Sequence, residues 1–275
     1  MAILLGIGAS LGIGISDYFG RFCSRRSDAT TTVLTALLAG IVVATALALV
    51  IPSALVGRDL ALGMVSGLTI GFALMLLYRG MSVASTAVVS PAVAFFMAIL
   101  PLLWDLVGGA SLSTRASVGV AIAIGGIVAT TVSPDLRGRI GAGLMFAIGS
   151  GVLFGIGMTL VGETTVDSGV WPAVGQRAVA WLTLALYGAV TAAPKLLPPS
   201  LRRLGLLSGA AGALGIALFI LGAQRGSLGP VAVSSSMFPA VTAVLAHLFD
   251  DDPLRWWQGI GIAMAIGGVA LIAAG

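Results

Sequence analysis

The chain has 275 residues, of which 58% are hydrophobic and only 9% are charged, with a mean hydropathy of +1.11. A soluble globular protein carries about 25% charged residues, so this composition excludes a water-soluble fold. The net charge of +4 does not indicate a nucleic-acid partner, because the basic residues lie at the ends of apolar segments, where such residues set membrane orientation.

Apolar segments long enough to cross a bilayer as helices, which takes about 20 residues, follow one another along the whole chain. In order, we expect ten transmembrane helices at residues 2–22, 30–51, 60–78, 84–104, 116–133, 141–161, 170–191, 204–222, 230–249 and 256–274. The connections are short, so we expect one all-α integral membrane domain. Met1 and Ala2 lead into the first segment without a basic region, so we expect a structural helix there and no cleavable signal peptide.

Four short motifs occur twice in the same order. They are a spaced glycine pattern, an Arg-Gly pair, a Pro-Ala-Val triplet and a Gly-x-Ala-x-Ala-Ile-Gly-Gly sequence. The copies begin at Gly6, Arg79, Pro91 and Gly119, and again at Gly149, Arg225, Pro239 and Gly261. Each copy holds five apolar segments, and an odd number inserts the second copy upside down, as in the inverted repeats of transporters. We therefore expect a first five-helix repeat at residues 1–133 and an inverted second repeat at residues 141–275.

Prolines interrupt the fourth and ninth segments at matching positions of the two halves. Pro91 and Pro239 each remove a backbone hydrogen bond and predict a kink, and serines precede both of them. Serine hydroxyls can bond to the carbonyl groups that such prolines free. Broken helices at equivalent positions indicate a transport site or gate, although a static kink explains the pattern equally well.

Three ionisable residues fall inside apolar segments, where a charge is costly. They are Asp17, Arg177 and His247. At 1.5 Å per residue, Asp17 and His247 lie in one half of the membrane, and Arg177 lies about 13 Å from Asp17 along the normal, too far for a direct ion pair. Asp17 is a candidate for binding a ligand amine or a proton, and Arg177 for an anionic group. Each residue also has a structural alternative. Asp17 could be an interfacial acid beside Arg21, Arg177 could bond to a helix-end carbonyl, and His247 could simply pack within the bundle.

Nothing in the chain indicates catalysis. The motifs of metalloproteases, serine hydrolases and P-loop enzymes are absent from the sequence, and the acidic run at residues 250–252 is explained by helix capping from Asp252. We therefore expect no enzyme activity, no cofactor and no bound metal. The alternatives are a membrane-embedded enzyme, which would gather Asp17, His247 and Arg177 at bonding distance, and a channel or lipid scramblase, which would show a continuous polar stripe.

Together these features resemble the EamA-type ten-helix branch of the drug/metabolite transporter superfamily. The second half carries most of the motifs, which are Phe238-Pro239-Ala240-Val241, Asp252-Pro253-Leu254, Gln258-x-x-Gly261 and Gly267-Gly268-Val269. Asp252 replaces the family's usual Glu, and the first half lacks this acid near Ala110. The resemblance implies export of small organic metabolites such as amino acids, by alternating access through a central cavity. Helices one, three, four, six, eight and nine would border it, with five and ten peripheral.

On this basis we expect the substrate or proton site at Asp17, Ser16, Ser90, Thr159, Arg177, Ser235, Ser236 and His247, with gating kinks at Pro91 and Pro239. The partners would be a small-molecule substrate and the lipid bilayer of the cell's inner (plasma) membrane, for a chain that can act as a monomer. Basic residues number ten on the side opposite the termini and three on the side of the termini, which favours termini outside the cytoplasm. The family resemblance favours the opposite orientation, and the sequence leaves both open.

Overall fold

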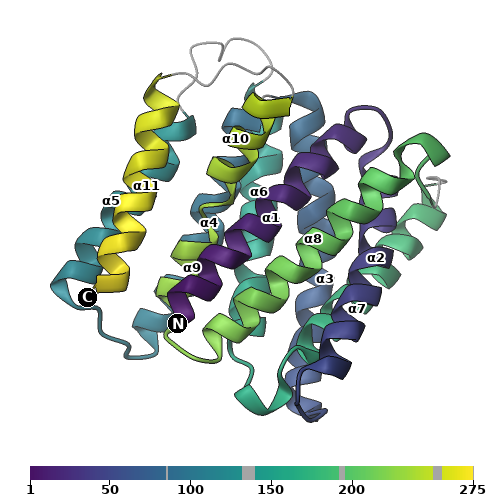
Figure 1. Ribbon diagram of the computed structural model, residues 1–275. Coiled ribbons are helices and arrows are strands. Elements are labelled where there is room, and N and C mark those ends of the chain that lie inside the picture. Colours follow the sequence, from purple (N-terminus) through teal and green to yellow (C-terminus); the bar gives the residue numbers. More distant parts are fainter. Residues whose placement is uncertain (85, 132–139, 192–195, 250–255, 275) are drawn as a thin grey trace.

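The protein is an all-helical bundle in the part of the chain that the computed structural model describes, which is every residue except 85, 132–139, 192–195, 250–255 and 275 (Figure 1). The helices are α1 (Ala2–Ser24), α2 (Ala29–Val50), α3 (Gly57–Val83), α4 (Thr86–Val107), α5 (Thr114–Thr131), α6 (Ile140–Gly162), the short 3₁₀ helix η1 (Val166–Ser168), α7 (Trp171–Val190), α8 (Pro199–Ala223), α9 (Leu228–Ser235), α10 (Phe238–Phe249) and α11 (Trp256–Ala274).

Seven segments among the described residues are long and apolar enough to cross a membrane. They are Ala2–Ser24, Ala29–Val50, Gly57–Val83, Val89–Val107, Ala142–Gly162, Pro199–Ala223 and Leu228–Phe249. The other three expected spans coincide with α5 and α11, whose apolar parts are shorter, and with α7, which carries the polar pair Gln176 and Arg177. The chain is therefore a multi-pass membrane protein, and the count of ten spans stays a prediction.

The two prolines that give the same sequence signal have different effects. The ninth span is broken before Pro239, because α9 ends at Ser235 and α10 begins at Phe238. The hydroxyls of Ser235 and Ser236 both donate to the Ala232 carbonyl, at 2.9 and 2.8 Å, so the serines do bond to the backbone there.

The fourth span, in contrast, continues as one helix through both Pro91 and Pro101. Ser90 Oγ is buried without a hydrogen-bond partner. The expectation that this hydroxyl satisfies a freed carbonyl is therefore wrong, since Ser90 Oγ bonds to none.

Small residues allow the helices to pack at backbone contact, as expected where lipid supplies no hydrophobic force between helices. A Cβ added at Gly12 of α1 would lie 2.7 Å from Gly215 N and 2.8 Å from Ala211 O of α8. A Cβ at Gly119 of α5 would lie 2.6 Å from Gly268 O of α11. These contacts hold α1 against α8, and α5 against α11.

The packing partners define a central group of helices and a peripheral pair. Helix α1 packs on α8, α9 and α10, while α3 and α4 both pack on α6, and α2 lies against α7 and α8. Helices α5 and α11 pack mainly on each other and stand at one edge of the bundle (Figure 1).

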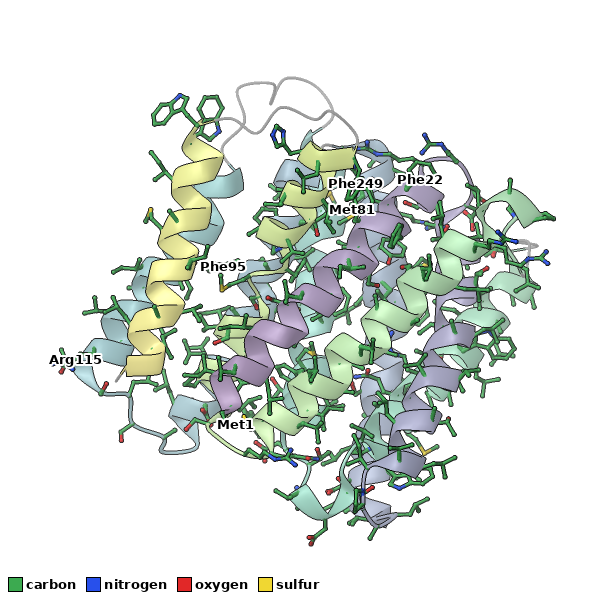
Figure 2. All side chains as sticks on the ribbon, in the orientation of Figure 1. Met1, Phe22, Met81, Phe95, Arg115 and Phe249 are labelled. Carbon is green, nitrogen blue, oxygen red and sulfur yellow. The ribbon has the colours of Figure 1, made fainter. Side chains whose placement is uncertain are left out.

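The N-terminus and the end of α11 lie at the same end of the bundle (Figure 1), which we call the terminal end. Figure 2 shows Met1 and Arg115 toward this end, and Phe22, Met81 and Phe249 toward the opposite end.

Candidate functional site

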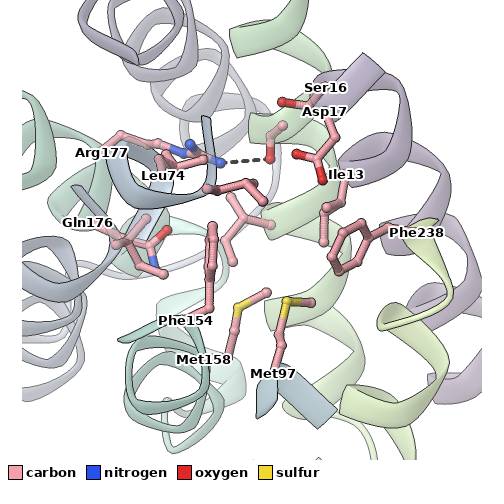
Figure 3. Close-up of a pocket in the computed structure, with 14 residues that line it drawn as sticks. Ile13, Ser16, Asp17, Leu74, Met97, Phe154, Met158, Gln176, Arg177 and Phe238 are labelled. Carbon is pink, nitrogen blue, oxygen red and sulfur yellow. Dashed lines mark hydrogen bonds between the residues drawn. The ribbon is translucent and has the colours of Figure 1, made fainter. Parts of the chain in front are cut away.

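A cavity lies among the central helices, where α1, α3, α4, α6, α7, α8 and α10 meet (Figure 3). Its volume is about 40 Å³. Its wall is mainly apolar, and its lining residues are Ile13, Ser16, Asp17, Ile70, Leu74, Leu77, Met97, Phe154, Met158, Gln176, Arg177, Gly212, Ile216 and Phe238. The expected helices border it, with α7 as an additional one.

Asp17 is the acid of this cavity. Its side chain is only 2% exposed, and Oδ2 has no hydrogen-bond partner. Neighbouring polar groups fix this part of α1, since Ser208 Oγ of α8 donates to the Ser16 carbonyl at 2.8 Å and lies 3.3 Å from Tyr78 Oη of α3. Asp17 therefore lies on the cavity wall, next to a residue whose carbonyl is bonded to α8, and does not face open solvent beside Arg21.

Arg177 reaches the same cavity from α7. Its side chain is 7% exposed, Nη2 donates to the Gly212 carbonyl of α8 at 2.7 Å, and Nε has no partner. A Cβ added at Gly212 would lie 2.8 Å from Ser16 Oγ and 3.6 Å from Arg177 Nη2, so the guanidinium and α1 approach the same patch of α8. The positions along the membrane normal estimated from the sequence separate Asp17 from Arg177. In the structure, however, their side chains line one cavity and point toward it from opposite sides (Figure 3).

Gln176 is a cavity residue that the sequence analysis missed. It is fully buried, Nε2 donates to Ser66 Oγ at 2.8 Å, and Oε1 has no partner. Its position beside Arg177 within an apolar segment was a usable signal, because a polar amide inside a membrane span is rare for the same reason as a charge.

The other expected site residues do not line this cavity. Ser235 and Ser236 bond to their own helix, and Thr159 Oγ1 donates to Gly155 O within α6 at 2.8 Å. His247 is exposed near the end of α10, and Ser90 is buried in α4 away from the cavity. The acidic run at residues 250–252 lies outside the described residues.

At the terminal end, a polar network ties α3 to the segment between α6 and α7. Asp59 is fully buried and its Oδ2 accepts hydrogen bonds from Thr165 N at 2.7 Å and Thr165 Oγ1 at 2.6 Å. Arg58 Nη1 lies 3.1 Å from Asp59 Oδ1 and donates to the Glu163 carbonyl at 3.0 Å. Trp104 Nε1 of α4 donates to the Glu163 carboxylate at 2.8 Å. These contacts join the first half of the chain to the second.

Residues 141–274 match the model of the EamA-like transporter family. The match covers slightly less than half of the chain and lies in its second half. The EamA-like half includes α6 to α11 and contributes Phe154, Gln176, Arg177 and Phe238 to the cavity. The match confirms the resemblance drawn from the motifs to the drug/metabolite transporter superfamily. Members of a transporter family are not enzymes, which fits the expected lack of catalysis.

The fold is also found among solved structures. One crystal structure has a TM-score of 0.73 over 99% of this chain and 98% of its own, at 19% sequence identity. At this identity the likeness concerns the fold alone, and it extends over the EamA-like half and the half that precedes it. No curated protein matches the sequence.

Proposed function

We propose that the protein exports small zwitterionic metabolites, such as amino acids, by alternating access through the cavity between α1, α7 and α8. The observation that carries the proposal is the placement of a carboxylate and a guanidinium on one apolar-walled cavity. Among the described residues no ion pair joins Asp17 to Arg177, and each has a buried polar atom without a partner.

Electrostatics explains why such a site favours a zwitterion. A buried charge without a partner is strongly destabilising, so a ligand that brings an ammonium to Asp17 and a carboxylate to Arg177 compensates both charges at once. A ligand with only one charge leaves the other protein group uncompensated. The apolar remainder of the wall, which includes Met97, Phe154 and Met158, then contacts the ligand's carbon skeleton.

We further propose that the chain is two five-helix repeats, at residues 1–133 and 141–275, related by inversion, so that ten helices cross the membrane. The packing partners support this arrangement. Matched in order, α6, α7 and α8 correspond to α1, α2 and α3, the broken pair α9 and α10 corresponds to α4, and α11 corresponds to α5. The packing of α1 on α8 then corresponds to that of α6 on α3, and the packing of α1 on α9 and α10 corresponds to that of α6 on α4. Contacts between α2 and α7, and between α5 and α11, correspond to themselves.

Export as the direction of transport rests on the family resemblance. In alternating access, the two similar halves would exchange conformations, which would open the cavity to one side of the membrane and then to the other. The cavity has a volume of only about 40 Å³, so loading of a ligand requires that the helices around it separate.

Purified protein in proteoliposomes tests the function. We expect saturable transport of a radiolabelled amino acid, competed by other small amino acids but not by an amine without a carboxylate or a carboxylate without an amine. Asp17→Asn and Arg177→Gln should each weaken the apparent affinity roughly 30-fold or more, the cost of truncating one partner of a buried charge pair.

Arg225→Gln serves as the matched control, because Arg225 follows the end of α8 and its Nη1 donates to the Leu221 carbonyl of that helix, outside the cavity. Parental transport by both cavity variants would exclude this site. Equal competition by the amine or the carboxylate alone would exclude a zwitterionic substrate.

A further inference from the structure

The buried carboxamide of Gln176 carries an additional property of the cavity. Gln176 has no exposed surface, and it lines the cavity together with Asp17 and Arg177. Its nitrogen is bonded to Ser66 of α3, while its oxygen has no partner. In Figure 3 the carboxamide oxygen is turned toward the other lining side chains.

The hydrogen-bond network decides which end of the amide faces the cavity. Ser66 Oγ donates its single hydrogen to the Gly157 carbonyl of α6 at 2.8 Å. A hydroxyl has only one hydrogen to donate, so Ser66 can only accept from Gln176. The amide nitrogen must therefore face Ser66, which leaves Oε1 turned away from Ser66 and toward the other lining side chains (Figure 3). Ser66 is a positioning residue that presents a fixed acceptor to whatever occupies the site.

We infer that Gln176 Oε1 accepts a hydrogen bond from a side-chain O–H or N–H of the transported zwitterion, so that the site selects amino acids with a side-chain donor over apolar isosteres. This inference rests on the proposed function. Asp17 and Arg177 bind the ammonium and carboxylate groups that every amino acid has, whereas Gln176 contacts the side chain, in which amino acids differ.

The physical basis is the cost of a buried acceptor that is left unpaired. When the helices separate to admit a ligand, a side-chain donor placed beside Oε1 can bond to it, and a methyl group in that place cannot. Sites built to bond to a ligand hydroxyl discriminate strongly against the analogue without it. Since a neutral hydrogen bond and the associated desolvation are worth about 1–3 kcal/mol, we expect a preference of roughly 10- to 100-fold.

L-threonine and L-valine are suitable probes because they differ only by a hydroxyl in place of a methyl group. In proteoliposomes, the parent protein should take up L-threonine with at least roughly tenfold higher apparent affinity than L-valine. Gln176→Met keeps the length of the side chain and removes the acceptor, so it should bring this ratio close to one while L-valine is still transported.

Two further variants complete the experiment. Ser66→Ala frees the amide to turn, so it should lower the same ratio, and it provides the test should Gln176→Met fail to fold. Thr159→Val removes a hydroxyl of α6 that bonds within its own helix and does not line the cavity, so the ratio should stay parental.

The possible outcomes distinguish failure of this inference from failure of the proposed function. Amino-acid transport with no preference for L-threonine, or with a preference that survives Gln176→Met, overturns the role of Gln176 and leaves the proposed function standing. Transport of neither amino acid by folded parent protein overturns both.

Discussion

Asp59→Asn is expected to destabilise the terminal end of the bundle. The Asp59 carboxylate has no exposed surface and accepts two hydrogen bonds from Thr165 through Oδ2. An asparagine amide has one oxygen, without a charge. Turned toward Thr165, this oxygen can accept both bonds, but the amide nitrogen then replaces Oδ1 opposite Arg58 Nη1, where two donors meet. The substitution therefore removes the charge from both Thr165 bonds and the acceptor from Arg58.

The size of the effect follows from these contacts. A hydrogen bond to a charged group contributes about 1.5–3 kcal/mol and a neutral one about 0.5–1.5 kcal/mol. The two weakened Thr165 bonds, together with the donor pair at Arg58, therefore give an expected loss of about 2–4 kcal/mol for Asp59→Asn. Arg58 is 60% exposed, and exposed ion pairs contribute about 0–1 kcal/mol, so Arg58→Ala should cost less than about 1 kcal/mol. Thr165→Val removes one of the two bonds and should fall between the two variants.

Thermal unfolding in detergent measures this order. At about 2–4 °C per kcal/mol, Asp59→Asn should lower the midpoint by about 4–16 °C, and Arg58→Ala by no more than about 4 °C. The remaining monodisperse protein, followed by size-exclusion chromatography after heating, gives the midpoint. Equal midpoints for Asp59→Asn and Arg58→Ala would refute the reasoning that the buried Thr165 bonds dominate this network.

Two other predictions concern packing and topology. Gly209→Ala places a Cβ against the Ala36 carbonyl oxygen of α2, so overpacking should cost about 1–3 kcal/mol, whereas Gly57→Ala meets nothing within 4 Å and should leave the thermal midpoint unchanged or slightly higher. Cysteines introduced beside the two termini should react with an impermeant maleimide from the same side of the membrane, while buried Cys23 stays unlabelled. Labelling from opposite sides would exclude an even number of spans.

The membrane class, the approximate helix positions and the family were all predictable from the sequence. Composition and segment length determine them, because a bilayer accepts only long apolar helices that satisfy their own backbone. Asp17 and Arg177 were also recognisable as candidates, since an ionisable residue within an apolar segment is rare whatever surrounds it.

The repeated glycines show where the sequence signal ended. Gly6 of α1 faces Ser234 of α9, but its sequence counterpart Gly149 of α6 faces Leu76 of α3. Matching the halves in order would have placed Gly149 against α4. The spacing of glycines along a helix indicates a face of small residues. It does not indicate which neighbouring helix packs on that face, because this depends on how the helices are rotated against one another.

Only the tertiary structure decided which polar groups share the cavity. Positions along the membrane normal placed Asp17 near His247 and far from Arg177, yet Asp17 and Arg177 line the same cavity and His247 lies outside it. Gln176 became visible as a free acceptor only because Ser66, 110 positions earlier, uses its own hydrogen on Gly157. Depth is a property of one helix and can be read from its sequence. Which side chains meet depends on helix rotation, side-chain reach and hydrogen bonds between distant segments, and these are settled only when all the helices pack together.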